Sequence, residues 1–178
     1  MCGYFDNKSN TDAALWFIKS IWPLIISRNN KIRCWFIGKG INNEMMRASL
    51  NKSNITMIPD IDDLRPYRKS ASVFINPMRL GSGLRIKILE AMGSGLPVVS
   101  TSLGAAGIPA QNGENCFIGD TPKEFADAIL WLINDKNLAN RIGENGKDMV
   151  KQRYEINKCI KLFESICNDT ISLDAVKN

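Results

Sequence analysis

Short apolar runs alternate with stretches of helical periodicity along most of this chain. Runs with the length of buried strands lie at residues 32–37, 55–58, 71–75 and 97–101, with a shorter edge segment at 116–118. Before, between and after them, apolar residues recur three and four positions apart, as on one face of a helix. This spacing predicts helices at residues 11–22, 44–50, 62–68, 85–92, 122–134, 138–153 and 156–171.

The order of these elements predicts the fold class. Strands that alternate with helices form βαβ units, whose right-handed crossovers build a parallel sheet with helices on both faces. We therefore expect one α/β, doubly wound, Rossmann-like domain over residues 1–178, with a helix-rich C-terminal tail from Thr121 onward. In such sheets, ligands bind outside the carboxyl ends of the strands, and the glycine loops of this chain lie there.

Composition and charge exclude few functions but limit the available chemistry. Of the 178 residues, 44% are hydrophobic and 23% are charged, which suits one folded domain. The net charge of +5 is spread along the chain without a dense cluster, so no nucleic-acid partner is expected. The sequence has no histidine, and its five cysteines form no CxxC motif. Neither a metal site nor a disulfide framework is therefore predicted, and a reducing cytoplasm is the expected setting.

Several residues have ordinary structural interpretations. Asn10 or Thr11 is expected to cap the first helix. The aspartates at 60, 62 and 63 suggest helix capping and not a metal site, because the other ligands of a calcium loop are missing. The turn at residues 38–40 lacks the third glycine of a dinucleotide fingerprint, so an ordinary strand-to-helix turn is expected. Packing is the expected role of all four tryptophans, Trp16, Trp22, Trp35 and Trp131.

The loop at residues 76–84 is rich in glycine and leads from a strand into a helix. Its glycines permit positive φ and let backbone N–H groups approach a ligand closely. The helix that begins near Arg85 adds N–H donors and about half a positive charge, which favour an anion. Arg85 and Lys87 oppose this dipole unless a bound anion such as pyrophosphate compensates. The residues therefore suggest a phosphate site, although such a loop is also common as a simple turn.

Lys87 and Glu90 fall on one stripe of the predicted helix, together with Gly83 and Ser94. The apolar residues occupy the opposite stripe and would face the sheet. Lys87 would then offer a cation to phosphate, and Glu90 a carboxylate that accepts hydrogen bonds from hydroxyl groups. The same spacing is also that of a solvated surface ion pair.

The segment at residues 76–108 resembles the C-terminal, nucleotide-sugar-binding domain of the group 1, or family 4, retaining glycosyltransferases, which have GT-B architecture. Similar members read glycine-x-glycine, two basic residues, lysine-hydrophobic-hydrophobic-glutamate-alanine, and then glycine-x-proline-valine-valine. The matching residues are Gly81-Ser82-Gly83, Arg85, Lys87-Ile88-Leu89-Glu90-Ala91 and Gly95-Leu96-Pro97-Val98-Val99. The likeness extends upstream to Gly3, through residues 9–13 and Trp16, and downstream to about residue 165.

The resemblance implies a role for each matching residue. Glu90 would hold the ribose hydroxyls, and Arg85 and Lys87 would neutralise phosphate charge; these three are the expected catalytic residues. The backbone of residues 81–84 would face the diphosphate and the donor sugar, and residues 58–61 would border the base. The donor-binding residues are thus expected to be Ile58, Pro59, Asp60, Gly81, Ser82, Gly83, Leu84, Arg85, Lys87 and Glu90.

Two departures from the family pattern bear on activity. The first glutamate of the family's paired motif would lie eight residues before Glu90, where this chain has Ser82. A serine can donate a hydrogen bond to a sugar hydroxyl but adds no charge. The family's arginine and lysine near the first strand also have no clear match, and Lys8 is a candidate for one of them.

The resemblance implies an enzyme that transfers a sugar from a UDP- or GDP-linked donor to a glycan or lipid-linked acceptor, without a metal or other cofactor. We expect the chain to be a piece of this enzyme that lacks the N-terminal acceptor-binding domain, and to catalyse no transfer alone. The expected location is the cytoplasm, either free or at the inner face of the membrane. A non-catalytic nucleotide-sugar-binding subunit and a nucleotide-sugar epimerase of the same architecture are the alternatives.

Overall fold

The computed structural model of the protein describes residues 1–50, 52 and 54–175. In this part of the chain, parallel strands form two sheets. One sheet pairs β1 (Cys34–Ile37) with β2 (Ile55–Ile58), and the other has the order β3 (Phe74–Asn76), β4 (Val98–Ser100) and β5 (Phe117–Ile118). The N-terminal residues run beside β1, where Cys2 forms a parallel bridge with Ile37.

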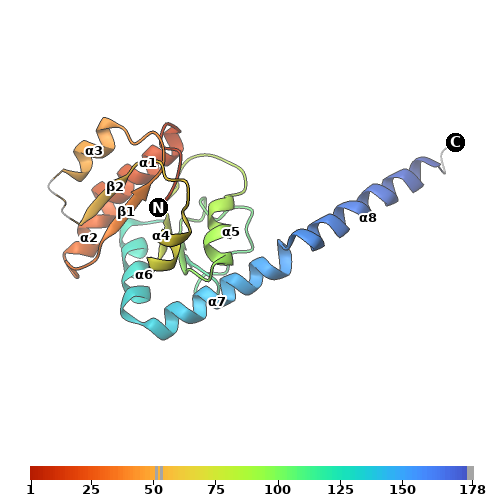
Figure 1. Ribbon diagram of the computed structural model, residues 1–178. Coiled ribbons are helices and arrows are strands. Elements are labelled where there is room, and N and C mark those ends of the chain that lie inside the picture. Colours follow the sequence, from red (N-terminus) through yellow and green to blue (C-terminus); the bar gives the residue numbers. More distant parts are fainter. Residues whose placement is uncertain (51, 53, 176–178) are drawn as a thin grey trace.

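Helices lie on both sides of these sheets (Figure 1). The first helical stretch is continuous and contains a π-helical segment, η1. In chain order the helices are α1 (Lys8–Trp16), η1 (Phe17–Ile21), α2 (Trp22–Ile26), α3 (Asn43–Ser49), α4 (Arg65–Ser70), α5 (Ile86–Gly93), α6 (Pro122–Asn134), α7 (Lys136–Arg153) and α8 (Ile156–Ala175). The predicted fold class, a doubly wound Rossmann-like α/β domain with a helix-rich tail, is therefore confirmed.

Neighbouring residues of a strand pack on opposite faces. In β3, Ile75 belongs to an apolar core that includes Phe17 of η1 and Phe125 of α6. The preceding residue, Phe74, belongs to a second core that includes Ile88 of α5. Because side chains alternate along a strand, a sheet covered on both faces needs strands that are apolar throughout. This explains why the strands appear in the sequence as continuous apolar runs.

Most differences from the predicted elements lie at their ends. The strand at residues 55–58 and the helix at 122–134 have the expected bounds. The predicted cap of the first helix is wrong, because α1 begins earlier and Asn7 is its N-cap, accepting a hydrogen bond of 2.8 Å from the Ser9 N–H. Asn10 and Thr11 lie inside the helix, and their side chains donate to the carbonyls of Tyr4 and Phe5.

The predicted packing of the tryptophans is wrong at one position. Trp16 and Trp22 are buried and Trp35 is half-buried, whereas Trp131 is 55% exposed. The Trp131 ring lies against Phe117 of β5, with the ring centroids 5.7 Å apart. Because β5 is a short edge strand, this side of α6 has little sheet to cover it.

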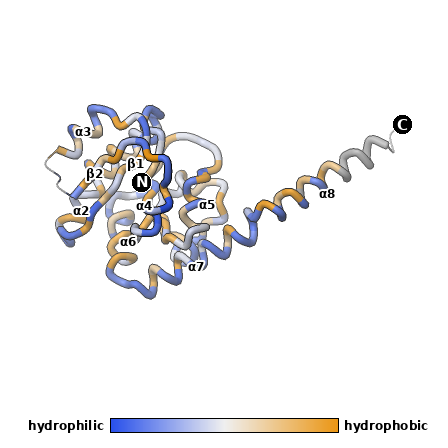
Figure 2. Tube along the Cα trace, viewed as in Figure 1, coloured by the Kyte–Doolittle hydropathy of each residue, from blue (hydrophilic) through white to orange (hydrophobic). Residues whose placement is uncertain are grey.

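The last two helices carry the chain away from the sheets (Figure 1). α7 packs on α5, and α8 continues beyond the rest of the molecule. Apolar residues three and four positions apart are exposed along α8 (Figure 2): Ile156, Ile160, Phe163 and Ile166. Among the described residues, no helix combines the length and the apolar character needed to cross a membrane.

Candidate functional site

The turns that follow the parallel strands meet at one edge of the molecule. The Gly38 N–H donates to the carbonyl of Ile58 at 3.0 Å, which joins the turn after β1 to the end of β2. The Phe5 N–H donates to the carbonyl of Lys39 at 2.7 Å, which joins the N-terminal loop to the same turn. The loop at residues 77–84 follows β3 at the carboxyl end of its sheet. This edge is where doubly wound sheets bind ligands.

A glycine at position 38 lets the N-terminal loop approach the turn after β1. A Cβ atom at Gly38 would lie 1.8 Å from the carbonyl oxygen of Gly3, and the φ of Gly38 is 142°. Any side chain there would push the N-terminal loop outward. The close approach therefore depends on this glycine, and it seats residues 3–6 beside the start of α1.

The glycine-rich loop at residues 77–84 is anchored to α1 by an arginine. The guanidinium of Arg79 donates to the carboxylate of Asp12 at 2.8 Å and lies 4.9 Å from the centroid of the Trp16 ring. The hydroxyl of Thr101, which follows β4, donates to the carbonyl of Met78. Both contacts hold the first part of the loop, Arg79 to α1 and Met78 to the residue that follows β4.

A buried polar cluster supports the base of this loop. Asn76, Ser100 and Thr101 are all at least 95% buried. The Asn76 amide donates to the Ser100 hydroxyl at 3.1 Å, and the Gly104 N–H donates to the Thr101 hydroxyl at 2.9 Å. Hydrogen-bonded polar groups in an apolar interior give one well-defined arrangement. The ends of β3 and β4 are therefore joined by side chains as well as by backbone pairing.

Arg85 occupies the N-cap position of α5 and lies beneath the glycine loop. Its Nη1 donates to the carbonyl of Ser82 at 2.6 Å. Its Nε and Nη2 atoms are buried, and no described residue accepts a hydrogen bond from them. A Cβ atom at Gly81 would lie 3.0 Å from Nη2 and 3.2 Å from the Ser9 hydroxyl, so Arg85 faces the first turn of α1. Two guanidinium donors are thus left for an acceptor outside the described residues.

Lys87 lies over the N-terminal loop, on the same side as Arg85. A Cβ atom at Gly3 would lie 3.0 Å from Lys87 Nζ and 3.4 Å from Cγ of Asn10. Burial lowers the pKa of Lys87, and the nearby Arg85 charge lowers it further, whereas Cys2 and Glu90 act in the opposite direction. The charged form of a half-buried ammonium group is disfavoured by a second cation, and an anion bound between the two cations would stabilise it.

Glu90 lies one turn further along α5 and has a partner that the sequence did not predict. Its Oε2 atom accepts a hydrogen bond of 2.5 Å from Nη2 of Arg68 on α4. The side chain of Glu90 is 45% exposed. Arg68 fixes the direction of this carboxylate, and Oε1 can still accept hydrogen bonds from a ligand.

The other predicted donor-binding residues lie at the same edge but are mostly exposed. Ser82, Gly83 and Leu84 are exposed along the loop. After β2, Ile58 is half-buried and Pro59 is exposed. Asp60 forms an ion pair of 3.0 Å with Lys39 of the turn after β1. The residues predicted for the diphosphate therefore gather around α5, whereas those predicted for the base gather around β2.

The site contains residues that the sequence analysis did not assign to it. Ser9 and Asn10 face Arg85 and Lys87 from the first turn of α1, and Arg79 anchors the loop. The serine and asparagine resembled ordinary capping residues, so their spacing gave no signal. Arg79 lies in the glycine-rich loop, two residues before Gly81, and this position was the only hint in the sequence.

Among the described residues, no group of three or more acidic or cysteine side chains could hold a metal ion. Asp63 accepts hydrogen bonds from the backbone and side chain of Arg65, but the N-cap of α4 is Leu64 and no side chain caps this helix, so the capping interpretation of the aspartates is wrong here. The cysteines of this part of the chain are free thiols. Burial raises the pKa of the Cys34 and Cys116 thiols to about 11, so both stay protonated at neutral pH.

Comparison with known proteins identifies close sequence relatives. The family described as glycosyl transferases group 1 matches residues 1–135. The chain is 28% identical over 165 residues to an uncharacterized 44.6 kDa protein in the cps region of Klebsiella pneumoniae, covering 89% of this chain and 42% of that protein. It is 27% identical over 155 residues to the capsular polysaccharide biosynthesis glycosyltransferase CapM of Staphylococcus aureus, covering 83% and 40%. It therefore spans about two fifths of these relatives.

Solved structures share the fold. TarM of S. aureus, crystallised as a mutant in complex with UDP, fondaparinux and alpha-GlcNAc-glycerol, has a TM-score of 0.80 at 16% identity, covering 92% of this chain and 34% of that chain. The C-terminal domain of the glycosyl transferase group 1 family protein LpcC from Francisella tularensis has a TM-score of 0.69 at 22% identity, covering 88% and 84%. The same arrangement of strands and helices is thus common to these chains.

Proposed function

Because the chain belongs to the group 1 glycosyl transferases, we propose that it binds the nucleotide diphosphate-sugar donor of a sugar-transfer enzyme. The diphosphate binds at the N-terminus of α5, against Arg85, Lys87 and the backbone of residues 81–84. The complete enzyme transfers the sugar to a glycan or lipid-linked acceptor with retention of anomeric configuration, as the family resemblance implies.

The observation that carries this proposal is the state of the Arg85 guanidinium. Two of its nitrogen atoms, Nε and Nη2, are buried, and no described residue accepts a hydrogen bond from them. Leaving buried charged donors unsatisfied costs more than about 1–3 kcal/mol, so such an arrangement favours a ligand with acceptor atoms. The oxygens of a phosphate fit both the fork of the guanidinium and the N–H groups that begin α5.

The same groups suit the chemistry of sugar transfer. When the bond between sugar and phosphate breaks, negative charge grows on the nucleoside diphosphate that leaves. Arg85, Lys87 and the N-terminus of α5 are fixed in place before the reaction and stabilise this charge as it develops. With these cationic groups in place, the leaving group needs no metal ion. We propose that no metal ion takes part in the transfer.

Glu90 is proposed to hold the ribose of the donor. Its carboxylate is oriented by Arg68 through Oε2, and its other oxygen can accept a hydrogen bond from a ribose hydroxyl. Ile58, Pro59 and Asp60 are proposed to border the base. Ser82 takes the place of a family glutamate and is proposed to hydrogen-bond the donor sugar without adding charge.

The acceptor is proposed to bind to a part of the enzyme outside this chain. The chain spans about two fifths of the length of its curated relatives, which leaves room for an acceptor-binding half. The exposed apolar face of α8 supports a contact with that half. On this basis, the chain alone binds the donor nucleotide but transfers no sugar.

Calorimetric titration of the chain with UDP and GDP, and with uridine and guanosine, tests the proposal. The double variant Arg85→Ala/Lys87→Ala removes two charge-assisted contacts to phosphate, so the affinity for the preferred diphosphate should fall about 100-fold or more. Binding of the matching nucleoside should change by less than about twofold, because it lacks the phosphates.

The variant Arg28→Ala/Lys123→Ala is the matched control, since it removes two cations that pair with Asp127 on α6. It should leave diphosphate binding unchanged. Equal losses for the diphosphate and the nucleoside in the Arg85/Lys87 variant would refute the phosphate assignment.

Glu90→Gln should weaken binding of the ribonucleotide more than binding of its 2′,3′-dideoxy analogue. Equal losses for the two ligands would show that Glu90 does not bind the ribose hydroxyls.

A further inference from the structure

Arg68 of α4 is the least exposed cation among the ion pairs of the described residues. Its side chain is 21% exposed, whereas the cations of the other pairs are 44–82% exposed. Ion pairs between exposed side chains are screened by water and salt and hold neither partner firmly. A guanidinium that is largely shielded from water can hold Glu90, its partner, in one orientation.

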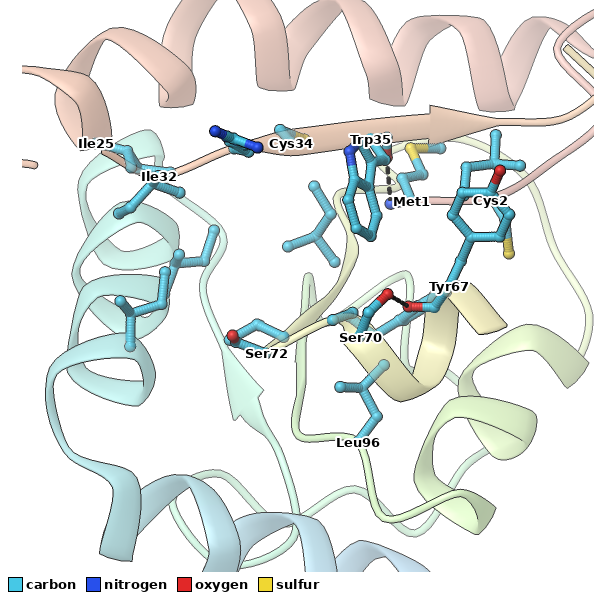
Figure 3. Close-up of a pocket in the computed structure, with 18 of the residues that line it drawn as sticks. Met1, Cys2, Ile25, Ile32, Cys34, Trp35, Tyr67, Ser70, Ser72 and Leu96 are labelled. Atoms are coloured by element: carbon cyan, nitrogen blue, oxygen red, sulfur yellow. Dashed lines mark hydrogen bonds between the residues drawn. The ribbon is translucent and has the colours of Figure 1, made fainter. Parts of the chain in front are cut away.

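The helix that carries Arg68 is held in place by an aromatic contact. α4 has six residues, which is too few for a helix to be stable alone. The ring of Tyr67 meets the ring of Trp35 on β1 edge to face, with the centroids 5.7 Å apart. Figure 3 shows Tyr67 directed from α4 toward β1 beside Trp35, with the Ser70 hydroxyl bonded to the Tyr67 carbonyl. This contact fixes α4 against the sheet.

The packing of Tyr67 sets the direction of Arg68. The two residues are consecutive, so their side chains leave the helix about 100° apart. Tyr67 meets β1, and Arg68 meets Glu90 on α5. The guanidinium thus reaches α5 from a fixed place, and it selects one rotamer of the Glu90 side chain.

The ion pair leaves the two carboxylate oxygens of Glu90 in different states. Oε2 accepts a hydrogen bond of 2.5 Å from Arg68, and no described residue donates a hydrogen bond to Oε1. A carboxylate without such a partner can accept from both neighbouring hydroxyls of a ribose, one at each oxygen. In this chain Oε2 is already occupied, so Oε1 is the oxygen left for a ribose.

We propose that Arg68 is a positioning residue, which makes Glu90 accept a hydrogen bond from a single ribose hydroxyl of the donor. This rests on the proposed function, in which Glu90 holds the ribose. The hydroxyl that meets Oε1 gains a charge-assisted hydrogen bond, whereas its neighbour has no free carboxylate oxygen to meet. The site therefore distinguishes the 2′-hydroxyl from the 3′-hydroxyl, which a carboxylate that accepts at both oxygens does not.

Calorimetric titration of the chain with the 2′-deoxy and 3′-deoxy forms of UDP and GDP measures this selectivity. Loss of the hydroxyl that donates to Oε1 should reduce the affinity about tenfold or more, because a hydrogen bond to a charged group is lost. Loss of the other hydroxyl should reduce it by less than about threefold. For the preferred base, the ratio of the two affinities is therefore the quantity that reports on Arg68.

Two substitutions of Arg68 test its part in the selectivity. Arg68→Met removes the guanidinium but keeps a long unbranched side chain. Glu90 can then turn both oxygens toward the ribose, so the ratio of the two affinities should fall to within about twofold. Arg68→Lys still offers an N–H group to Oε2 and should retain most of the ratio. A purely structural role of Arg68 would lower both affinities together and leave their ratio unchanged.

Arg28→Gln is the matched control, because Arg28 also pairs with a carboxylate of another element, that of Asp127 on α6. It should leave the ratio unchanged, and a change as large as that in Arg68→Met would overturn the proposal. Equal affinities of the two analogues for the unaltered chain, or an unchanged ratio in Arg68→Met, would overturn it while leaving Glu90 on the ribose. Equal losses for the ribonucleotide and its dideoxy analogue in Glu90→Gln would instead overturn the ribose contact itself, and this proposal with it.

Discussion

Two helices of this molecule, α5 and α6, begin in opposite ways. At α6 the Thr121 hydroxyl accepts from the Glu124 N–H at 3.2 Å, and the Glu124 carboxylate accepts from the Thr121 N–H at 3.0 Å. These hydrogen bonds lower the pKa of Glu124, whose negative charge also matches the positive end of the helix dipole. At α5 the N-cap position holds Arg85, no described side chain caps the helix, and a lysine stands in the first turn.

Under the proposed function, the difference separates a helix start that serves folding from one that serves a ligand. The capping hydrogen bonds and the acidic residue at the start of α6 stabilise that helix without a ligand. The start of α5 has no side-chain cap and carries cations in place of the acidic residue. Cations at the start of a helix cost about 0.3–1 kcal/mol each when nothing compensates. A local cost of this kind is retained where the same groups bind an anion. The comparison therefore predicts that changes at α5 act mainly on binding and changes at α6 mainly on stability.

The largest expected effect comes from giving α5 the kind of start that α6 has. Arg85→Ser replaces the guanidinium with a hydroxyl that can cap the helix. The affinity for UDP or GDP should fall about 10- to 100-fold, because charge-assisted hydrogen bonds to phosphate are lost. The melting temperature should stay equal or rise. Calorimetry and thermal unfolding measure the two effects. An unchanged diphosphate affinity would contradict the idea that the start of α5 acts mainly on binding. Arg141→Ser, on the exposed face of α7, is the control variant.

The next effect is the converse change at α6. Thr121→Ala removes the capping hydroxyl and should lower the free energy of unfolding by about 1 kcal/mol, measured by urea denaturation. Diphosphate affinity should remain within about twofold, since the hydrogen bonds of Thr121 are made with Glu124 inside the start of α6. Thr121→Ser keeps the hydroxyl and should restore most of the stability. A loss of affinity as large as that in Arg85→Ser would mean that the two helix starts are not separate in function.

The smallest effect concerns the buried charge of Lys87. Burial gives Lys87 a lower pKa in the folded state than in the unfolded chain, so its protonated form opposes folding. Lys87→Met should therefore raise stability slightly at neutral pH, by less than the loss in Thr121→Ala. The unfolded wild-type chain binds more protons between the two pKa values, so its stability rises with pH through that window and the advantage of Lys87→Met shrinks. Urea denaturation from pH 7 to 11 measures this, and an advantage that grows with pH would contradict it.

The sequence predicted elements well wherever a local pattern decides them. The strand at 55–58 is apolar at three of its four residues, and the helix at 122–134 has a capping box and a proline at its start. The start of α1 was predicted wrongly because Asn7, Asn10 and Thr11 are all good capping residues. The choice among them depends on the carbonyls of Tyr4 and Phe5, which the N-terminal loop brings within reach.

The candidate site was predictable in its residue types but not in its partners. The helical stripe placed Lys87 and Glu90 correctly on α5, but no local pattern indicates that Arg68 of α4 holds Glu90, since 22 residues separate them. The contact of Arg85 and Lys87 with the first turn of α1 likewise depends on the fold, through the approach of Gly3 to Gly38.

The position of Arg79 over Trp16 makes the indole an internal optical reporter of the glycine-rich loop at residues 77–84. The emission of an indole depends on the electric field of nearby charges, and here a guanidinium lies 4.9 Å from the ring centroid. Any rearrangement of residues 77–84 changes this field through Arg79 itself. Fluorescence of Trp16 thus follows the loop in real time without a dye, and Trp16→Phe supplies the spectrum of the other three tryptophans for subtraction.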